Sequence, residues 1–268
     1  MKYENLYDMH THSIHSFDGN HSISALCKSA VEMGGKGIAV TDHCDIDGVE
    51  DYRALCKNQL NDLQLAIDDY GKSIDIIKGL EIGQGIYRDK EAKDMYNNFD
   101  YDFILGSLHN LENMEDFYFL DYKQYDIYEL LGRYFSDLLK IVKQGCFDSL
   151  AHLTYPLRYI VAREHIDVDM SRFSDMTDQI FKELIKNNKA LEINTSGLFM
   201  DIKDTLPNIS YVKRFKELGG EYITVGSDSH FAEKLFQGIE VGMDIAAKCG
   251  FKNITVYKKH EPILIPIE

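Results

Sequence analysis

The chain repeats one plan along its length: a short apolar run of β type, a polar turn, and then a segment with helical periodicity. The runs that predict strands are 6–12, 37–41, 74–80, 103–108, 147–151, 190–194, 222–226 and 254–257. The segments that predict helices are 23–33, 51–70, 125–143, 173–187, 207–218 and 232–248. No Pro-rich or Ser-rich linker and no internal repeat interrupts this order. Seven or eight strands that alternate with helices predict either a (β/α) barrel or a doubly wound sheet.

Polar residues at the ends of the strand runs favour the barrel. The residues at or just past these ends are His12, His43, Glu81, His109, His152, Asp228 and His230. A parallel barrel gathers all its carboxyl strand ends at one face, whereas a doubly wound sheet concentrates such residues at one switch point. The length of 268 residues is one that single α/β barrels reach. We therefore expect residues 1–268 to form one barrel domain of the α/β class.

The same residues predict a metal centre. His10 and His12 stand two apart on the first strand run, so both imidazoles point to one face. Alone, this pair is weak evidence, because two exposed or hydrogen-bonded histidines have the same pattern, and Glu81 alone fits a salt bridge. However, the chain has only 10 histidines, and most of them stand at strand ends together with carboxylates. Independent structural roles would rarely produce that distribution, so we interpret it as a shared metal site.

Charge and cysteine usage exclude several other classes. The chain has 29 basic and 44 acidic residues, a net charge of -15, which argues against nucleic acid or an anionic membrane as a partner. The N-terminus lacks the pattern of a signal peptide, and no window is apolar enough to span a membrane, so we expect a soluble cytoplasmic protein. The 5 cysteines form no Cys-x-x-Cys pair, and we expect free thiols. Cys44, beside His43, is interpreted as a small buried side chain rather than a metal ligand.

The motifs at these strand ends, taken together, resemble those of a known family. The motifs are His10-Thr11-His12, Thr41-Asp42-His43, Glu81, Gly106-Ser107-Leu108-His109, His152 and Ser227-Asp228-Ser229-His230. In this order they resemble the PHP (polymerase and histidinol phosphatase) superfamily over nearly the whole chain. Asp18 and the segment 192–197 are similar to those of its monofunctional histidinol-phosphate phosphatases. The resemblance implies a distorted, TIM-like (β/α)7 barrel that binds up to three divalent metal ions at its C-terminal face.

The resemblance also implies how the ligands are shared among the ions. The first ion would be held by His10, His12, Glu81 and Asp228. Glu81 would bridge to a second ion, which His109 and His152 would also hold. The third ion would take Asp18, His43 and His230. Zinc, iron and manganese all suit this mixture of imidazole and carboxylate ligands.

The activity that the resemblance implies is hydrolysis of L-histidinol phosphate to L-histidinol and phosphate, in histidine biosynthesis. We expect a metal-bridging hydroxide to attack phosphorus in line, without a covalent phosphoenzyme. The catalytic side chains are then Asp18, Glu81, Asp228 and His230. The group that protonates the leaving alcoholate stays open among Asp18, His230 and a metal-bound water.

Substrate-binding residues are predicted on two loops. Arg158, on the loop that begins at His152, is the first choice for a phosphate ligand, and Arg163 is the second. The acidic and aromatic stretch between 110 and 126 predicts a long loop over the site, where Glu115 and its acidic neighbours would attract a cationic substrate.

Two segments depart from the family pattern, namely 153–158 and 198–201. Both follow strand ends near the expected substrate, so metal-dependent phosphoester chemistry is better supported than this particular substrate. One alternative is a phosphoesterase for another small phosphomonoester or a nucleotide, and a non-catalytic metal-binding barrel is the other. For either phosphatase activity the partner is a small phosphate ester. We expect a monomer or small homo-oligomer.

Overall fold

A seven-stranded parallel sheet in the order β1 to β7 forms the centre of the computed structural model, which describes residues 2–267. The strands are β1 (Tyr7–Thr11), β2 (Gly37–Asp45), β3 (Asp75–Gly83), β4 (Phe103–Ser107), β5 (Ser149–Leu150), β6 (Ala190–Asn194) and β7 (Ile223–Gly226). The first and last strands meet at their carboxyl ends, where the His12 N–H donates to the Ser229 carbonyl at 2.8 Å. The sheet is therefore a nearly closed barrel, and the predicted fold class is confirmed.

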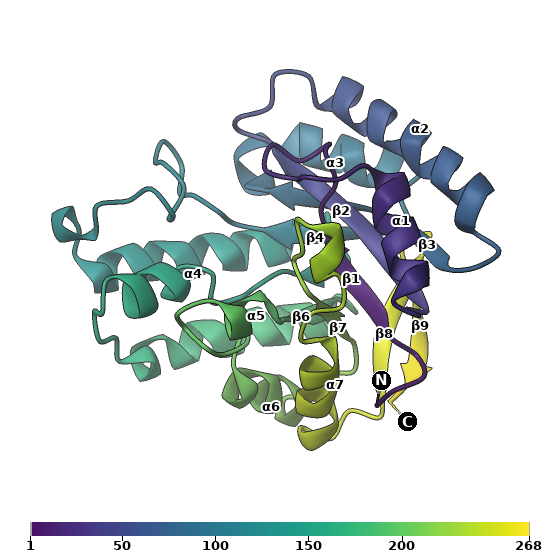
Figure 1. Ribbon diagram of the computed structural model, residues 1–268. Helices are drawn as coiled ribbons and strands as arrows, with labels where there is room; N and C mark the ends of the chain where they lie inside the picture. Colours follow the sequence, from purple (N-terminus) through teal and green to yellow (C-terminus); the bar gives the residue numbers. More distant parts are fainter. Residues whose placement is uncertain (1, 268) are drawn as a thin grey trace.

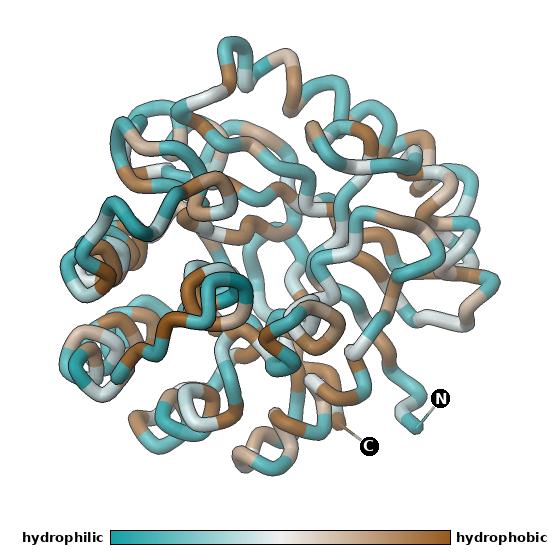
Figure 2. The backbone as a smooth tube through the Cα atoms, turned by 60° about the vertical axis from the view of Figure 1, so that its left-hand side comes forward, coloured by the Kyte–Doolittle hydropathy of each residue, from teal (hydrophilic) through white to brown (hydrophobic). Residues whose placement is uncertain are grey.

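Helices surround this inner ring of strands (Figures 1 and 2). They are α1 (Ile23–Glu32), α2 (Tyr52–Tyr70), α3 (Asp89–Asn98), α4 (Ile127–Gln144), α5 (Ser174–Lys186), α6 (Ile209–Glu217) and α7 (Ile239–Lys248). Several begin where a polar side chain caps the first turn: Ser22 accepts from the Ala25 N–H, and Asp126 accepts from the Tyr128 and Glu129 N–H groups. Each helix packs its apolar face on the strands and so leaves the strand ends free to carry polar groups.

Two strands are longer than the sequence predicted. β2 continues to Asp45 and β3 to Gly83, in register with each other along all nine residues. His43 and Glu81 therefore lie within the last three residues of β2 and β3 rather than after these strands. Their pairing partners hold these two side chains more firmly than a loop would. The helix α3 was also missing from the prediction, because its sequence is polar and only Ala92 and Met95 are buried.

Two predicted helix starts are wrong. The segment predicted as a helix over 232–248 is a short 3-10 turn, Ala232–Lys234, followed by α7 from Ile239. Phe236 and Gly238 both have positive φ, 61° and 81°, which a continuous right-handed helix does not allow. Pro207 does not start α6 either: Asn208 is the N-cap and accepts from the Ser210 N–H.

The eighth apolar run forms no barrel strand. It is β8 (Asn253–Lys258), which pairs with β9 (Glu261–Pro266) in an antiparallel hairpin. Lys259 and His260 make the two-residue turn with φ of 49° and 63°. The hairpin lies beside the amino ends of the barrel strands, near both termini (Figure 1). His260 places Nδ1 2.8 Å from the buried Asp148 carboxylate and so fastens the hairpin to the barrel.

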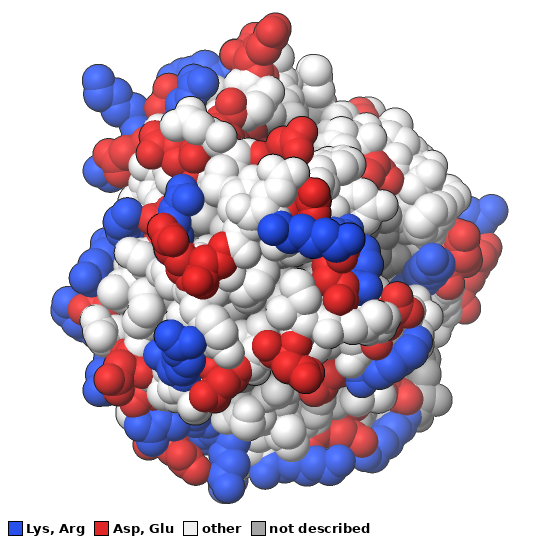
Figure 3. All heavy atoms as spheres, turned by 90° about the vertical axis from the view of Figure 1, so that its left-hand side faces the viewer, with Lys and Arg blue, Asp and Glu red and all other residues white. Residues whose placement is uncertain are grey.

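The remaining sequence expectations concern thiols, membranes and charge. All five cysteines are free, and Cys44 is fully buried against Met95. No helix among residues 2–267 has both the length and the apolar character needed to cross a membrane. On the face drawn in Figure 3, basic and acidic side chains are interspersed and no continuous basic strip is seen.

Candidate metal centre

The residues predicted as metal ligands converge at the carboxyl ends of the barrel strands. β1 and the residue after it carry His10 and His12, whose ring centroids are 5.0 Å apart. The register of β1 against β2 shifts just before Thr11, an irregularity of the kind that re-aims side chains beside active sites. The other strands contribute His43 and Glu81 directly, and His109, His152, Asp228 and His230 from the loops that follow β4, β5 and β7.

The Glu81 carboxylate lies at the centre of this cluster and is fully buried. Its Oε1 is 3.0 Å from His152 Nε2 and 3.3 Å from His109 Nε2. Its Oε2 faces the other side, 3.5 Å from His10 Nε2 and 3.8 Å from His12 Nε2. One carboxylate therefore separates two groups of imidazoles and offers one oxygen to each.

Asp228 approaches the His10 and His12 side of the cluster. Its Oδ1 lies 3.3 Å from His12 Nε2 and 3.6 Å from His10 Nε2. The residue has a φ of 56°, in the left-handed region that a residue with a side chain rarely adopts. Such strain persists where surrounding contacts enforce it, and here the Asp228 N–H donates to the His10 carbonyl at 2.8 Å.

A third group lies toward the mouth of the barrel. Asp18, on the loop after β1, has Oδ2 3.2 Å from His230 Nε2 and Oδ1 3.7 Å from His43 Nε2. The His12 ring stacks on the His230 ring with centroids 4.1 Å apart, so this group adjoins the first. Asp18 is the most exposed member, with 43% of its side chain accessible.

Several ligand atoms in this cluster are buried without any hydrogen-bond partner among residues 2–267. They are His10 Nε2, His12 Nε2, His43 Nδ1, Glu81 Oε2 and His230 Nε2. Carboxylate oxygens come close to the imidazole nitrogens, as between His43 Nδ1 and Glu81 Oε2 at 2.7 Å, but without hydrogen-bond geometry. Buried polar atoms are rarely left unpaired, and cations that accept their lone pairs would satisfy them.

Three sets of donor atoms are compact enough to hold an ion. They are His10, His12 and Glu81; His43, Glu81 and His109; and His12, His43 and His230. Within each set the ligand atoms lie within 4.8 Å of one another. The residues present therefore fit a centre of divalent metal ions, with imidazole and carboxylate donors of the type that zinc, iron and manganese accept.

The protonation states of Glu81 and His12 favour metal binding. Burial would raise the pKa of Glu81, but the imidazoles of His43, His109 and His10 hold it well below the ordinary value. Glu81 is therefore ionised. Burial lowers the pKa of His12 well below its ordinary value, and the neighbouring His230 and His43 lower it further. A neutral imidazole and an ionised carboxylate are the forms that bind a metal. Burial lowers the pKa of His10 and His109, but the carboxylates around them raise it well above the ordinary value, so an ion that binds there would displace their protons.

The outer nitrogens of three histidines have partners that fix the ring orientation. His10 Nδ1 lies 2.6 Å from Glu192 Oε1, and His109 Nδ1 lies 3.0 Å from Asp45 Oδ1. His12 Nδ1 lies 3.0 Å from the Ser16 hydroxyl oxygen. Each partner directs the opposite nitrogen, Nε2, into the centre, as is usual for histidines that bind metal.

Sequence reasoning did not assign roles to these orienting residues. Asp45 could have been found, because it ends the same strand run that carries His43. Glu192 stands on β6 within the segment that resembles the family, yet only the structure shows its Oε2 accepting from the His152 N–H at 2.7 Å. Ser16 carries no signal of its own, since serines in loops are common.

Above the centre lies a cavity of about 410 Å³ that opens to solvent. Arg158 lines it with only 8% of its surface exposed, and its Nη2 lies 3.6 Å from Asp228 Oδ2 and 3.4 Å from the Ser196 hydroxyl. The guanidinium stacks on Tyr155 at 4.7 Å, and its Nε has no hydrogen-bond partner among the described residues. A buried arginine with an unused donor is suited to bind an anion.

Two residues predicted to bind substrate lie outside this cavity. The Arg163 guanidinium is held by the long loop over the site, where it donates to the Tyr118 carbonyl at 2.6 Å. Glu115 is exposed on the outside of the same loop. Its neighbour Asp116 lines the cavity instead and accepts from the Tyr155 hydroxyl at 2.9 Å. Adjacent loop residues point in opposite directions, and only packing decides which one faces inward.

Apolar side chains surround the mouth of the cavity. Phe17, Phe119, Tyr118 and Met200 all line it, and Phe17 is 82% exposed. The Phe17 ring stacks on His43 with centroids 5.3 Å apart. Exposed aromatic rings around a pocket usually mark a surface that a ligand covers.

Comparison with known proteins points to one family. The model of the PHP domain matches residues 8–196. A probable histidinol-phosphatase of Thermotoga maritima is 31% identical over 258 residues, which are 94% of this chain and 95% of that protein. A probable histidinol-phosphatase of Clostridium acetobutylicum is 27% identical over 261 residues, 95% of this chain and 98% of that protein.

A solved structure with the same fold is the histidinol phosphate phosphatase of Lactococcus lactis, complexed with zinc, L-histidinol and phosphate. Its TM-score is 0.83 and its sequence identity 24%, and the match covers 97% of this chain and 99% of that one.

Proposed function

Because this chain belongs to the PHP domain family, we propose that it is a metal-dependent phosphomonoesterase that hydrolyses L-histidinol phosphate to L-histidinol and phosphate. Relatives matched over almost their full length carry the name histidinol-phosphatase. The observation that carries the proposal most directly is the cluster of buried, unpartnered imidazole and carboxylate atoms beneath Arg158.

The proposed centre has up to three divalent ions, zinc, iron or manganese. His10, His12, Glu81 and Asp228 would hold the first, and Glu81, His109 and His152 the second. Asp18, His43 and His230 would hold the third. The division of the two Glu81 oxygens between separate groups of imidazoles supports the bridging role. When bound, the ions supply positive charge that offsets the charge of the phosphoryl group and lowers the pKa of a water molecule.

The residues of the chain have separate roles in this reaction. Arg158 binds the phosphoryl oxygens through the donors that its neighbours leave free. Glu81 and Asp228 fix the histidines around the reacting group and balance the charge of the centre. Asp18 and His230 are the most exposed titratable groups of the cluster, 3.2 Å apart, and one of them or a metal-bound water would supply the proton that the leaving alcoholate needs.

The leaving group occupies the aromatic part of the cavity. Histidinol combines an ammonium group with a flat ring, and the cavity combines the Asp116 carboxylate with the rings of Phe17, Tyr118 and Phe119. An aromatic face attracts cations and stacks on planar groups. Asp116 takes the role that the sequence assigned to Glu115, and we do not extend a substrate-binding role to Arg163.

A second candidate is hydrolysis of another small phosphomonoester or a nucleotide. Arg158 is the one arginine among residues 2–267 that lines the cavity, which limits how strongly the cavity selects among phosphate esters. A non-catalytic metal-binding barrel is the weaker alternative, since all nine predicted ligands are present and face one another.

One assay separates these functions. The metal-loaded protein is incubated with L-histidinol phosphate, a nucleoside monophosphate and a short oligonucleotide, and released phosphate is measured. We expect kcat/KM for L-histidinol phosphate to exceed the others at least tenfold. Equal or absent turnover of L-histidinol phosphate would overturn this substrate, and no turnover of any ester would favour the non-catalytic barrel.

We further propose that residues 1–268 act as one barrel domain, in the cytoplasm, as a monomer or small homo-oligomer. One hydrophobic cluster that joins the strands to α4, α5 and α7 supports the single domain. Light scattering coupled to gel filtration measures the oligomeric state, and a single cooperative melting transition is the result expected for one domain.

A further inference from the structure

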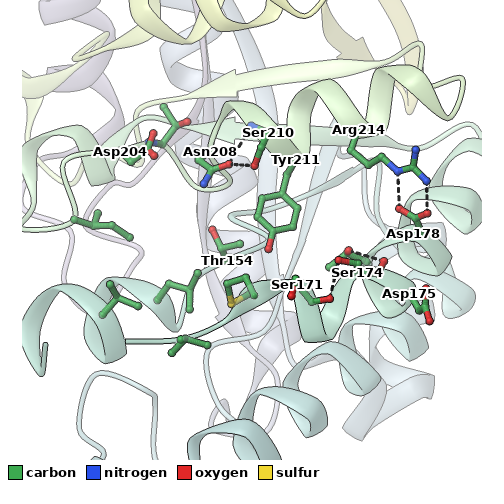
Figure 4. A pocket seen from close by; sticks show the side chains of 17 residues that line it. Thr154, Ser171, Ser174, Asp175, Asp178, Asp204, Asn208, Ser210, Tyr211 and Arg214 are labelled. Carbon is green, nitrogen blue, oxygen red and sulfur yellow. Dashed lines mark hydrogen bonds and ion pairs between the residues drawn. The ribbon is translucent and has the colours of Figure 1, made fainter. Parts of the chain in front are cut away.

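A second and larger cavity lies outside the catalytic centre, with a volume of about 770 Å³. It is formed where the amino ends of α5 and α6 meet the segment 154–161 and the loop 202–208 (Figure 4). None of the predicted metal ligands lines it. This cavity is therefore distinct from the candidate metal centre.

This cavity and the catalytic cavity share one wall. In the segment that follows His152, Thr154, Leu157 and Val161 line the second cavity. The intervening residues Tyr155, Arg158 and Tyr159 line the catalytic one. Residues 158–163 form a π-helical turn, a rare conformation that often occurs at functional sites. A molecule in the second cavity would therefore contact the same segment that positions Arg158.

Two hydroxyl groups in the second cavity have no hydrogen-bond partner among the described residues. Thr154 is only 3% exposed, and its hydroxyl makes no hydrogen bond although it lines the cavity. Tyr211 points from α6 toward the segment that carries Thr154, again without a partner for its hydroxyl (Figure 4). Burial raises the pKa of Tyr211 to about 12, so it remains a donor at neutral pH. By contrast, the hydroxyls of Ser171, Ser174 and Ser210 are satisfied locally.

The charge of the cavity selects cations. Asp175, Asp178 and Asp204 line it, and the basic side chain in the lining, Arg214, is held by Asp178 at 2.9 Å. The amino ends of α5 and α6 contribute a positive charge of roughly half a unit each, which is less than the two carboxylates that Arg214 does not neutralise. The remaining lining is largely apolar: Leu157, Val161, Val168, Met170 and Ile202.

We propose that this cavity is a second ligand site, for a small organic cation with an apolar body, and that its ligand acts on phosphate binding through the segment 154–161. The ammonium group would lie by one of the two carboxylates at the opposite ends of the cavity, Asp204 or Asp175, and a hydroxyl or ring nitrogen would pair with Thr154 and Tyr211 between them (Figure 4). That a ligand binds here is inferred from the second cavity alone. That the bound ligand changes phosphate binding also depends on the proposed role of Arg158.

The test uses two probes of the same shape and opposite charge, phenethylamine and 3-phenylpropionate, titrated by calorimetry into the metal-loaded protein. We expect phenethylamine to bind at least tenfold more tightly than 3-phenylpropionate. The double variant Asp175→Asn/Asp204→Asn should weaken phenethylamine binding at least fivefold. Tyr211→Phe should weaken tyramine, which adds a ring hydroxyl, at least twofold and should leave phenethylamine binding unchanged. The control Asp68→Asn/Asp69→Asn changes the net charge equally on the exposed face of α2 and should leave binding unchanged.

Coupling is measured as the change in the inhibition constant of inorganic phosphate when phenethylamine is present, and we expect at least a threefold change. Equal binding of the two probes, or equal effects of the two double variants, would overturn the second site. Specific binding with an unchanged phosphate constant would overturn the coupling. If phosphate esters are not hydrolysed but phenethylamine binding follows the expected pattern, the proposed function fails and the second site stands.

Discussion

The orientation of His12 provides the sharpest test of the proposed centre. The Ser16 hydroxyl donates its single proton to the buried Asp42 carboxylate at 2.9 Å, so its oxygen can only accept. The Ser16 oxygen accepts from the backbone N–H of His43 at 3.0 Å, and the ring nitrogen Nδ1 of His12 is also 3.0 Å from it. His12 must therefore carry its proton on Nδ1, which leaves the lone pair of Nε2 for a metal ion. We predict that Ser16→Ala weakens metal binding by removing this constraint.

Loss of such an orienting partner typically costs roughly 10- to 100-fold in metal affinity, which is about 1.4 to 2.7 kcal/mol. Ser13→Ala is a matched control, because the Ser13 hydroxyl also donates to Asp42, at 2.8 Å, but contacts no predicted ligand. Each hydroxyl donates to Asp42 and accepts from one backbone N–H, so both variants should lower the free energy of unfolding of the metal-free protein by a similar amount, about 2 kcal/mol for two hydrogen bonds. Only Ser16→Ala should weaken zinc binding.

The assay is competition for zinc against a chelator of known affinity, together with thermal melts of both metal-free variants. Nitrogen-15 spectra of the histidine rings report the tautomer of His12 directly. If the two variants lose zinc affinity equally, or if Ser16→Ala leaves both the affinity and the tautomer unchanged, the orienting role of Ser16 is refuted.

Three further predictions concern the cluster and its cavity. Glu81→Gln should abolish turnover and lower the bound metal by two ions together, as measured by elemental analysis; loss of a single ion would contradict bridging. Arg158→Lys should reduce kcat/KM at least tenfold because a buried bidentate donor is lost, whereas Arg163→Lys should change it less than threefold; similar losses would refute the assignment. Zinc at 100 times its Kd should stabilise the fold by about 2.7 kcal/mol and raise the melting temperature by about 5 to 10 °C, an increase that a chelator should reverse.

Much of the barrel follows from local sequence signals. Short β-branched runs and amphipathic helical segments alternate because each strand must pack against the helix that follows it. The convergence of the proposed ligands was predictable for the same reason: a polar residue that ends a buried strand faces the one edge where all the strands finish. His10, Glu81 and Asp228 come from distant parts of the chain, yet each could be recognised by its place relative to its own strand.

Other elements were not predictable, because competing local patterns were equally plausible. The apolar periodicity from Ala232 onward fits a continuous helix, and only the left-handed conformations of Phe236 and Gly238 show where it is broken. The last apolar run has the composition of a barrel strand, but it pairs with β9 and is anchored through His260 on Asp148. In both cases tertiary contacts outweigh propensity.

The sequence by itself determined the barrel and the residue types at its carboxyl face, since both depend on periodicities within single elements. Only the tertiary structure decided that Asp116 rather than Glu115 faces the catalytic cavity, and that Arg163, the second choice beside Arg158, does not line it. It also decided the partners of the histidines, such as Glu192 for His10. Loop backbones have no fixed period, so the direction of each side chain depends on contacts between elements far apart in the chain.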